Sequence, residues 1–254
     1  MRYIEYYGDD RFRHKIVYAK DAYSECVYCG AEAKTREHAP SKVFLNKPYP
    51  GDLPIVPACF KCNNSFSKDE LFLAILIEKL KNSFYGSQYP LSDETLARLD
   101  INPKIASAID NAIVSNDFAQ FDHRIKNVAL KLAISHAVYE LSEGYCAKDA
   151  NIDYSFSNNM SIENREDFES AIVLNDKLLP EIGSRAYERI MVMEVSAQSQ
   201  EQPDQTVTVP LMLLDWVDVQ ESRYLYTCYN LSDAIVVKMI ISDFLFVSVI
   251  LYIE

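Results

Sequence analysis

The chain has 254 residues, of which 49% are hydrophobic and 24% charged, a composition that can bury the core of one or two domains. Its longest apolar run, residues 244–253, has about half of the ~20 residues that a membrane helix needs. The first residues are mixed and charged, without the apolar segment of a secretory signal, so we expect a soluble protein of the cytoplasm.

The formal net charge of −12 is concentrated in the last hundred residues. Residues 1–70 carry 11 Lys and Arg against 10 Asp and Glu, and residues 71–150 carry 8 against 10. Residues 151–254 carry 6 against 17. Because proteins bind DNA largely by neutralising phosphates with Lys and Arg, we expect this last segment not to lie along DNA.

Four of the six cysteines form two Cys-x-x-Cys pairs, Cys26/Cys29 and Cys59/Cys62, which are separated by 29 residues. Each such turn presents two sulfur atoms to one point, so four thiolates at this spacing can close a tetrahedral zinc site. In a reducing compartment, paired cysteines favour a metal over a disulfide framework. We therefore predict structural zinc, because four thiolates leave no open position for water.

Three further polar residues stand inside or directly after this cysteine framework. Glu37 and His38 lie between the two pairs, and Asn63 follows the last cysteine. A zinc knot alone has no need for a carboxylate, an imidazole and an amide at these places. An imidazole with its ordinary pKa of ~6.5 accepts a proton readily near neutral pH, so we assign His38 as a general base for an attacking water.

The local patterns around these residues predict a loop, two short strands and a helix. Six Gly and Pro residues between positions 26 and 55 exclude a long helix there. Ser67 and Glu70 have the Ser-x-x-Glu spacing of a capping box, and apolar residues at helical spacing follow from Leu71. We interpret Ser67 and Glu70 as this cap rather than as residues that face the metal. A position facing the metal stays open for Asn64 and Asp69.

In this order, the two Cys pairs, the Glu37-His38 dipeptide, Asn63 and the following helix resemble the HNH (ββα-metal) endonucleases. The resemblance is to the zinc-stapled branch with four cysteines, which includes phage Holliday-junction resolvases, and it covers roughly residues 24–82. It implies a ββα-metal fold that hydrolyses phosphodiester bonds of DNA with Mg²⁺ or Mn²⁺. It also implies that Glu37 and Asn63 are the ligands of this catalytic cation.

The chain departs from the family at one position, because the family often has Asp where this chain has Glu37. The longer side chain changes the reach to the metal, so Glu37 either binds the cation or only orients its neighbourhood. Three lysines near the motif are candidates for contacts with substrate phosphates, with a solvated surface role as the equal alternative: Lys42, Lys47 and Lys61.

The middle of the chain is predicted to be helical. Ser92 has the character of a helix cap, Pro103 fits a first turn, and a longer helix is expected from about Asp122 to Gly144. On this last helix, His136 and Glu140 are one turn apart, and we interpret them as a surface ion pair rather than a metal site.

The last third is predicted to form an antiparallel sheet that can pack on the middle helices. Five of its segments are rich in Val, Ile, Tyr and Leu: residues 189–195, 206–214, 223–229, 234–241 and 244–253. The two remaining cysteines, Cys146 and Cys228, are expected to be buried free thiols.

We therefore predict an α+β protein, with a zinc-stabilised HNH nuclease domain over residues 1–90. A helical and then β-rich accessory or regulatory domain covers residues 91–254. HNH proteins with an extra C-terminal region resemble effector nucleases of bacterial anti-phage systems, some of which work beside an ATPase, and this implies a regulatory protein partner. A single HNH site cuts one strand, so a homodimer is one expected route to double-strand breaks. The alternatives are an inactive zinc-binding interaction module and an RNA-cutting variant.

Overall fold

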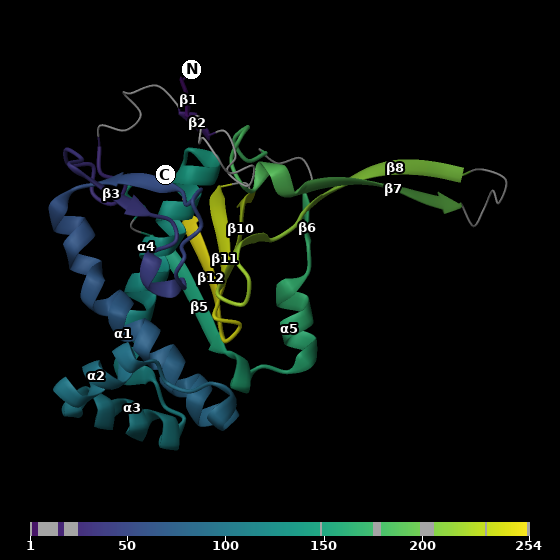
Figure 1. The fold of residues 1–254 in the computed structure, drawn as a ribbon. Coiled ribbons are helices and arrows are strands. Elements are labelled where there is room, and N and C mark those ends of the chain that lie inside the picture. The colour runs from purple at the N-terminus through teal and green to yellow at the C-terminus, as the bar shows by residue number, and fades with distance from the viewer. Residues whose placement is uncertain are drawn as a thin grey trace.

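The computed structural model describes residues 2–4, 15–17, 25–147, 149–174, 179–198, 206–231 and 233–252. For residues 2–4, 15–17, 197–198 and 206–207 the description is of the backbone alone. The chain is α+β, with helices in the middle of the sequence and antiparallel sheets in the C-terminal part (Figure 1). This arrangement confirms the predicted fold class at that level.

An antiparallel hairpin followed by a long helix forms the first layer. Strand β3 (Thr35–His38) pairs with β4 (Ile55–Ala58), and helix α1 (Phe60–Tyr85) begins two residues after β4. The residues between the strands carry most of the Pro and Gly residues that exclude a long helix there. A separate short pair, β1 (Arg2–Ile4) with β2 (Lys15–Val17), precedes this layer.

Helix α1 begins earlier than the sequence pattern predicts. Cys59 is its N-cap, and the Cys59 Sγ accepts the backbone N–H of Cys62 at 3.4 Å. Ser67 and Glu70 therefore lie inside the helix, and the predicted capping box is wrong. The pattern misled because a cysteine supplied the cap, a residue outside the usual Ser, Thr, Asp and Asn set.

Three helices follow, and their starts agree with the prediction. They are α2 (Asp93–Ile101), α3 (Pro103–Ser115) and α4 (Asp122–Leu141). Ser92 caps α2 by accepting the N–H of Thr95 at 3.2 Å. Pro103 is the first residue of α3, where its missing N–H costs no hydrogen bond.

Helix α4 lies at the centre of the molecule. Of its 20 residues, 13 are buried, so it is covered on nearly every side, as a core helix is. Helix α1 packs on one side of it and the five-stranded sheet on the other (Figure 1).

The five-stranded sheet is antiparallel throughout, with the order β5-β12-β11-β10-β9. Its inner face packs on α4, as the predicted packing of a sheet on the middle helices requires. All five predicted strand segments are present in the structure, but only the last three belong to this sheet, and the first two lie in a second sheet. The other two strands of this sheet, β5 and β9, were not predicted. The strands of this sheet are β5 (Ala150–Phe156), β9 (Val217–Gln220), β10 (Tyr224–Leu231), β11 (Ala234–Ile241) and β12 (Leu245–Tyr252).

A second antiparallel sheet, with the order β6-β8-β7, extends away from the body as an arm (Figure 1). It consists of β6 (Ile172–Leu174), β7 (Ile190–Gln198) and β8 (Thr206–Leu214), and α5 (Ile162–Glu169) precedes it. Several apolar side chains of β7 and β8 are exposed: Met191, Val192, Met193, Val195 and Val209.

One hydrophobic core runs across the predicted domain boundary at residue 90. It includes Leu76 of α1, Leu132 of α4 and Val237 of β11. The division into two domains stays a prediction, and residues 1, 5–14 and 18–24 of the first predicted domain lie outside the described residues. Of the helices that the structure describes, none combines the length and the apolar character that crossing a membrane requires.

The predicted surface ion pair of His136 and Glu140 is wrong, because both side chains are fully buried. His136 Nε2 and the Tyr224 hydroxyl are hydrogen-bonded at 2.9 Å, and the His136 ring stacks on that of Tyr226 at 3.8 Å. Glu140 accepts the Tyr226 hydroxyl and, at 2.8 Å, the backbone N–H of Ala186. We call His136, Glu140, Tyr224 and Tyr226 the His136 cluster.

The two cysteines outside the Cys-x-x-Cys motifs, Cys146 and Cys228, differ in their surroundings. Cys228 is fully buried in β10, as predicted, and burial raises the pKa of its thiol. Cys146 is only partly buried, so the prediction is wrong for this residue. Its backbone N–H donates to the carbonyl of Val27 at 2.8 Å, which places it beside the first cysteine pair.

Candidate metal centre and catalytic site

The four paired cysteines converge on one point. Their Sγ atoms all lie within 4.8 Å of one another, and those of Cys29 and Cys59 are 3.8 Å apart. A tetrahedral site with Zn–S bonds of ~2.3 Å places its sulfur atoms about 3.8 Å apart. The cluster therefore has the ligand type, number and spacing that zinc takes, and Cys26, Cys29, Cys59 and Cys62 can hold this ion.

Backbone hydrogen bonds hold the first cysteine pair in its turn. The N–H of Gly30 donates to the carbonyl of Cys26 at 2.8 Å, and Gly30 has a φ of +73°, which a side chain would strain. The N–H of Val27 donates to the carbonyl of Pro57 at 3.1 Å. This bond joins the first pair to β4, directly before the second pair.

The local hydrogen bonds also favour metal binding by Cys59. The N–H of Cys62, in the first turn of α1, lowers the pKa of Cys59 to about 7. Burial raises the pKa of Cys26 and of Cys62. Because zinc binds the thiolate, Cys59 is more easily deprotonated near neutral pH than Cys26 or Cys62.

Asn63 lies in the first turn of α1, next to Cys62, and its amide has a fixed orientation. The Thr35 hydroxyl donates to the carbonyl of Ala58 at 2.8 Å. Its oxygen can then only accept from Asn63 Nδ2, at 3.0 Å. This places the NH₂ group of Asn63 against β3 and leaves Oδ1 as the atom that can bind a further group. Sequence reasoning missed Thr35, because a threonine in a strand carries no signal of its own.

Glu37 is held by a lysine that is distant in the sequence. The Nζ of Lys131, on α4, lies 3.0 Å from Glu37 Oε1 and 2.7 Å from Glu70 Oε1. It also bonds to the hydroxyl of Ser41, which donates to Glu70 Oε1 at 2.6 Å. The side chain of Lys131 has no exposed surface, and those of Glu37 and Glu70 are 12% and 11% exposed. We call these four residues the Lys131 cluster.

One feature of the sequence indicates the Lys131 cluster. Lys131 interrupts a helix that is otherwise apolar, within the segment Ala129-Leu130-Lys131-Leu132-Ala133. A lysine is almost never fully buried unless it is paired. Its presence in that segment therefore indicates carboxylate partners, but the partners themselves come from β3 and α1.

His38 is the last residue of β3 and is partly buried. Side chains alternate between the two faces of a strand, so Thr35 and Glu37 share one face and His38 projects from the other. The structure thus brings Glu37, Thr35 and Asn63 to one side of the hairpin. A phosphate that contacts both Glu37 and His38 must lie at the end of β3 rather than over one face.

The three lysines predicted to contact phosphates are exposed. Lys42 and Lys47 lie in the connection between β3 and β4, where the Nζ of Lys42 is 5.3 Å from the ring centre of Tyr49. Lys61 lies in the first turn of α1, one residue before Cys62. All three are therefore on the surface around the cysteine cluster and the hairpin.

Asp69, which the sequence left open as a metal-facing residue, has other partners. Asp69 accepts the Arg124 Nε at 2.6 Å and the Asn127 Nδ2 at 2.9 Å. These contacts join α1 to α4. The carbonyl of Asn64 accepts the hydroxyl of Ser67 at 2.9 Å, within one turn of α1.

The C-terminal part of the chain holds the connection between β3 and β4 at two places. Arg185 forms an ion pair with Asp52 at 2.6 Å. The side-chain amide of Gln220, in β9, accepts the N–H of Asn46 at 2.7 Å and donates to its carbonyl at 3.0 Å. The loop that carries Lys42 and Lys47 is therefore shaped by residues from the far end of the chain.

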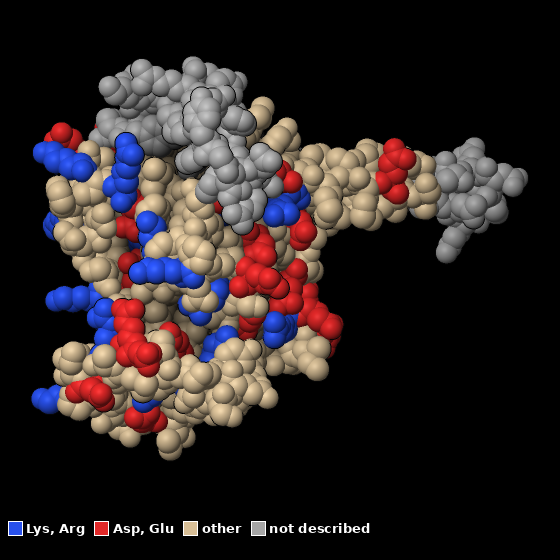
Figure 2. Space-filling model, in the orientation of Figure 1, with Lys and Arg blue, Asp and Glu red and all other residues tan. Residues whose placement is uncertain are grey.

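Charge is unevenly distributed over the molecule. Figure 2 shows acidic side chains gathered beside α5 and the base of the arm, whereas Lys and Arg are scattered over the side that α1 and the hairpin occupy. This agrees with the charge of −11 in residues 151–254. Phosphate contacts are therefore more favourable on the side of the hairpin.

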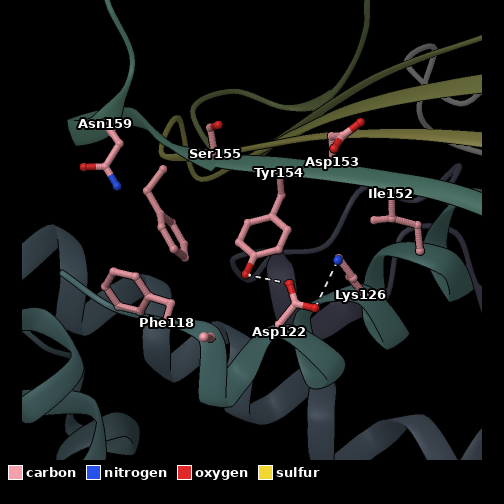
Figure 3. A pocket seen from close by; sticks show the side chains of 10 residues that line it. Phe118, Asp122, Lys126, Ile152, Asp153, Tyr154, Ser155 and Asn159 are labelled. Atoms are coloured by element: carbon pink, nitrogen blue, oxygen red, sulfur yellow. Dashed lines mark hydrogen bonds and ion pairs between the residues drawn. The ribbon is translucent and has the colours of Figure 1, made fainter.

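A surface hollow of about 350 Å³ lies elsewhere, between α4 and β5 (Figure 3). In it, Asp122 accepts the Tyr154 hydroxyl at 3.2 Å and pairs with the Lys126 Nζ at 3.0 Å (Figure 3). Burial and Asp122 raise the pKa of Tyr154 to about 12. The hollow includes none of the predicted catalytic or metal-binding residues, and its central polar groups bond to one another, so it adds nothing to the candidate site.

Comparison of the chain with known proteins gives no matching family model, no matching curated protein and no matching solved structure. The resemblance to HNH nucleases therefore rests on the residues and the geometry described above.

Proposed function

We propose that this protein is a metal-dependent endonuclease of the HNH type that hydrolyses phosphodiester bonds of DNA. The observation that carries the proposal is the paired fixation of Glu37 and Asn63 on one side of the hairpin. In each side chain, one polar atom is bound by the protein, and an oxygen is left for a cation. The β3-β4-α1 order around a four-cysteine cluster supports the proposal, because a ββα-metal site would require two strands followed by a helix.

His38 acts as the general base in this proposal. A water molecule attacks phosphorus, and its proton passes to the imidazole of His38. The bond from phosphorus to the 3′-oxygen breaks, and the leaving oxygen takes a proton from solvent. The products are a 5′-phosphate and a 3′-hydroxyl end.

Glu37 and Asn63 would hold the catalytic Mg²⁺ or Mn²⁺, which prefers oxygen ligands and keeps part of its shell for water and phosphate. When bound, this cation supplies electrostatic stabilisation of the charge that develops at phosphorus. The zinc role is structural, because Cys62 and Asn63 are neighbours in one turn of α1 and the Asn63 amide contacts Thr35 of β3. The cysteine cluster thereby fixes the distance between helix and hairpin.

The exposed Lys42, Lys47 and Lys61 supply phosphate contacts, and the acidic C-terminal part stays away from the substrate. Arg185 and Gln220 support a regulatory role for that part, since they hold the loop that bears two of these lysines. We extend the proposal to a nuclease controlled by a protein partner, such as an ATPase, in phage defence. A partner that moved β9 or residue 185 would move this loop.

Plasmid cleavage tests the proposal. The parent protein and His38→Ala, both with zinc content measured, are incubated with supercoiled plasmid, Mg²⁺ or Mn²⁺, with and without EDTA. We expect the parent to nick or linearise the plasmid only when the divalent ion is free, and the zinc-loaded variant to be at least about 100-fold slower.

Single-stranded DNA and structured RNA serve as further substrates in the same assay. Cleavage of RNA alone would assign the RNA-cutting alternative. A zinc-loaded parent that cuts none of the three, alone or with its partner, would contradict the enzyme proposal and leave a zinc-binding interaction module.

A further inference from the structure

We propose that Lys131 is a positioning residue for the catalytic cation, because it orients the carboxylate of Glu37 from the middle of α4. This inference rests on the proposed function, in which Glu37 is a ligand. Lys131 is 94 positions from Glu37 in the chain and lies outside residues 24–82, which carry the family resemblance.

The position of the Lys131 ammonium is fixed by partners other than Glu37. An ammonium group has three N–H donors. Two are directed to Glu70 Oε1, at 2.7 Å, and to the Ser41 hydroxyl, and the ammonium forms an ion pair with Glu37 Oε1 at 3.0 Å. Ser41 also donates to Glu70 at 2.6 Å, so the two anchors are bound to each other. The position of the ammonium is thus fixed by α1 and by the residues that follow β3.

The consequence for Glu37 is that one carboxylate oxygen is committed and the other is not. Oε1 is bound to Lys131, and among the residues that the structure describes, no hydrogen bond to Oε2 is found. A carboxylate held by one oxygen presents the other in a defined direction, which is how groups behind a metal ligand act on its affinity. Thr35 does the same for Asn63 by binding Nδ2.

The charge of the cluster also favours a further cation. Two carboxylates, Glu37 and Glu70, face a single ammonium, so a negative charge remains on the side of the cluster that is partly open. The Lys131 ammonium itself is fully buried, whereas 12% of the Glu37 side chain is exposed. A cation can therefore approach Glu37 without displacing Lys131.

Hydrogen bonds on α4 also connect Lys131 to the zinc cluster. The Tyr28 hydroxyl, between Cys26 and Cys29 in the chain, is hydrogen-bonded to Ser135 Oγ at 2.8 Å. Ser135 donates to the carbonyl of Lys131 at 2.8 Å. Helix α4 therefore contacts both the first cysteine pair and the carboxylate proposed as the cation ligand.

Manganese binding, measured by electron paramagnetic resonance on zinc-loaded protein, tests the inference with Lys131→Met. Positioning predicts that Mn²⁺ affinity falls about 10- to 100-fold, as for other groups behind metal ligands. Electrostatics alone predicts the opposite sign, because removal of a positive charge beside the site tightens cation binding. Unchanged or tighter binding would therefore overturn the proposal.

Two further variants complete the design. Lys126→Met is the matched control, since Lys126 lies on the same helix and pairs with Asp122, outside the Lys131 cluster, and we expect it to bind Mn²⁺ as the parent does. Ser41→Ala covers the case in which Lys131→Met does not fold, because it removes one anchor without changing any charge. It should weaken Mn²⁺ binding several-fold, and parent-like affinity in a folded Ser41→Ala would contradict the proposal.

The two levels of proposal fail in different ways. If the zinc-loaded parent neither binds Mn²⁺ nor cleaves nucleic acid, the proposed function fails, and the inference with it. If the parent binds Mn²⁺ and cleaves, while Lys131→Met matches it in both, the nuclease stands and only the role of Lys131 is wrong.

Discussion

Helix α4 carries two buried polar clusters on different sides. The Lys131 cluster faces the hairpin and α1, and the His136 cluster faces β10. Lys131 and His136 are five residues apart, which separates them by about 140° around the helix. One helix therefore supports both the candidate catalytic layer and the sheet behind it.

The two clusters differ in charge and in access. The Lys131 cluster pairs an ammonium with two carboxylates, and both carboxylates are partly exposed. The His136 cluster is sealed, burial lowers the pKa of His136 to about 3, and burial raises the pKa of Glu140. A cluster that keeps a polar oxygen near the surface can bind a ligand, whereas one whose groups face each other inside the core specifies packing.

Removal of zinc should produce the largest difference in stability between the hairpin side of α4 and the β10 side. Structural zinc contributes about 10–16 kcal/mol of binding free energy in small domains, and folding of the site depends on it. In Cys29→Ser/Cys62→Ser we expect amide protons of β3, β4 and the first turns of α1 to lose protection, while those of β10 keep it. Hydrogen exchange with zinc analysis measures this.

Cys146→Ser is the matched control for zinc removal, because Cys146 adjoins the first cysteine pair but is not one of the four clustered thiols. It should retain one zinc per chain. Loss of protection in β10 to the same extent as in the hairpin would show that the two sides do not behave differently.

The sealed cluster should respond to the loss of a single hydroxyl. Tyr226→Phe keeps the ring that stacks on His136 but leaves one oxygen of Glu140 without its donor. An unsatisfied buried acceptor costs about 1–3 kcal/mol, so the free energy of unfolding should fall by that amount in urea denaturation. Tyr252→Phe, at an exposed strand end, should change it little.

Acid should destabilise the protein through His136. The folded-state pKa of about 3 lies below the ordinary value of 6.5, so below pH 6.5 the unfolded chain binds a proton that the folded protein does not. The contribution of His136 to the free energy of unfolding is fully present above pH 6.5. It falls by up to about 1.4 kcal/mol per pH unit as the pH drops toward 3.

The contribution of Glu140 to stability changes with pH in the opposite direction. Burial raises its pKa, so the folded state binds a proton more readily than the unfolded chain and is favoured as the pH falls. Glu140 is present in both the parent and His136→Gln, so the comparison isolates His136. Between pH 6.5 and pH 5, the parent should lose about 2 kcal/mol more than the variant in denaturant titrations. Parallel losses would show that His136 titrates normally.

The smallest effect is expected at the contact between the C-terminal part and the loop after β3. Gln220→Ala removes two hydrogen bonds to Asn46 and should reduce stability by about 1 kcal/mol, since a hydrogen bond contributes little net free energy. Faster amide exchange at Asn46, with unchanged zinc content, is the expected result. Gln88→Ala, at an exposed site, is the control, and equal exchange in both would contradict the contact.

The sequence predicted those features that local pattern determines. The Cys pairs, the five strand segments and the starts of α2 and α3 follow from spacing, β-branched composition and caps. The start of α1 was missed because Cys59 caps it. That cap depends on the conformation of the cysteine turn, and a pattern of capping residues does not contain this information.

The polar residues of α4 were misread for a different reason. Charged residues one turn apart on a helix are usually solvated, and only the packing of α1 and the sheet around α4 shows that these are buried. The partners of Lys131 come from residues 37–70, and those of His136 from residues 224 and 226. Such long-range contacts depend on topology, which a single sequence does not specify.

In the proposed mechanism, His38 takes the proton from the water that cleaves a phosphodiester bond. Chemical rescue tests it most directly: single-turnover cleavage of end-labelled DNA by zinc-loaded parent and His38→Ala, with and without added imidazole. We expect 5′-phosphate and 3′-hydroxyl ends for the parent, a rate at least about 100-fold lower for the variant, and partial recovery with imidazole. Cleavage by His38→Ala at the parent rate, without imidazole, would contradict this mechanism.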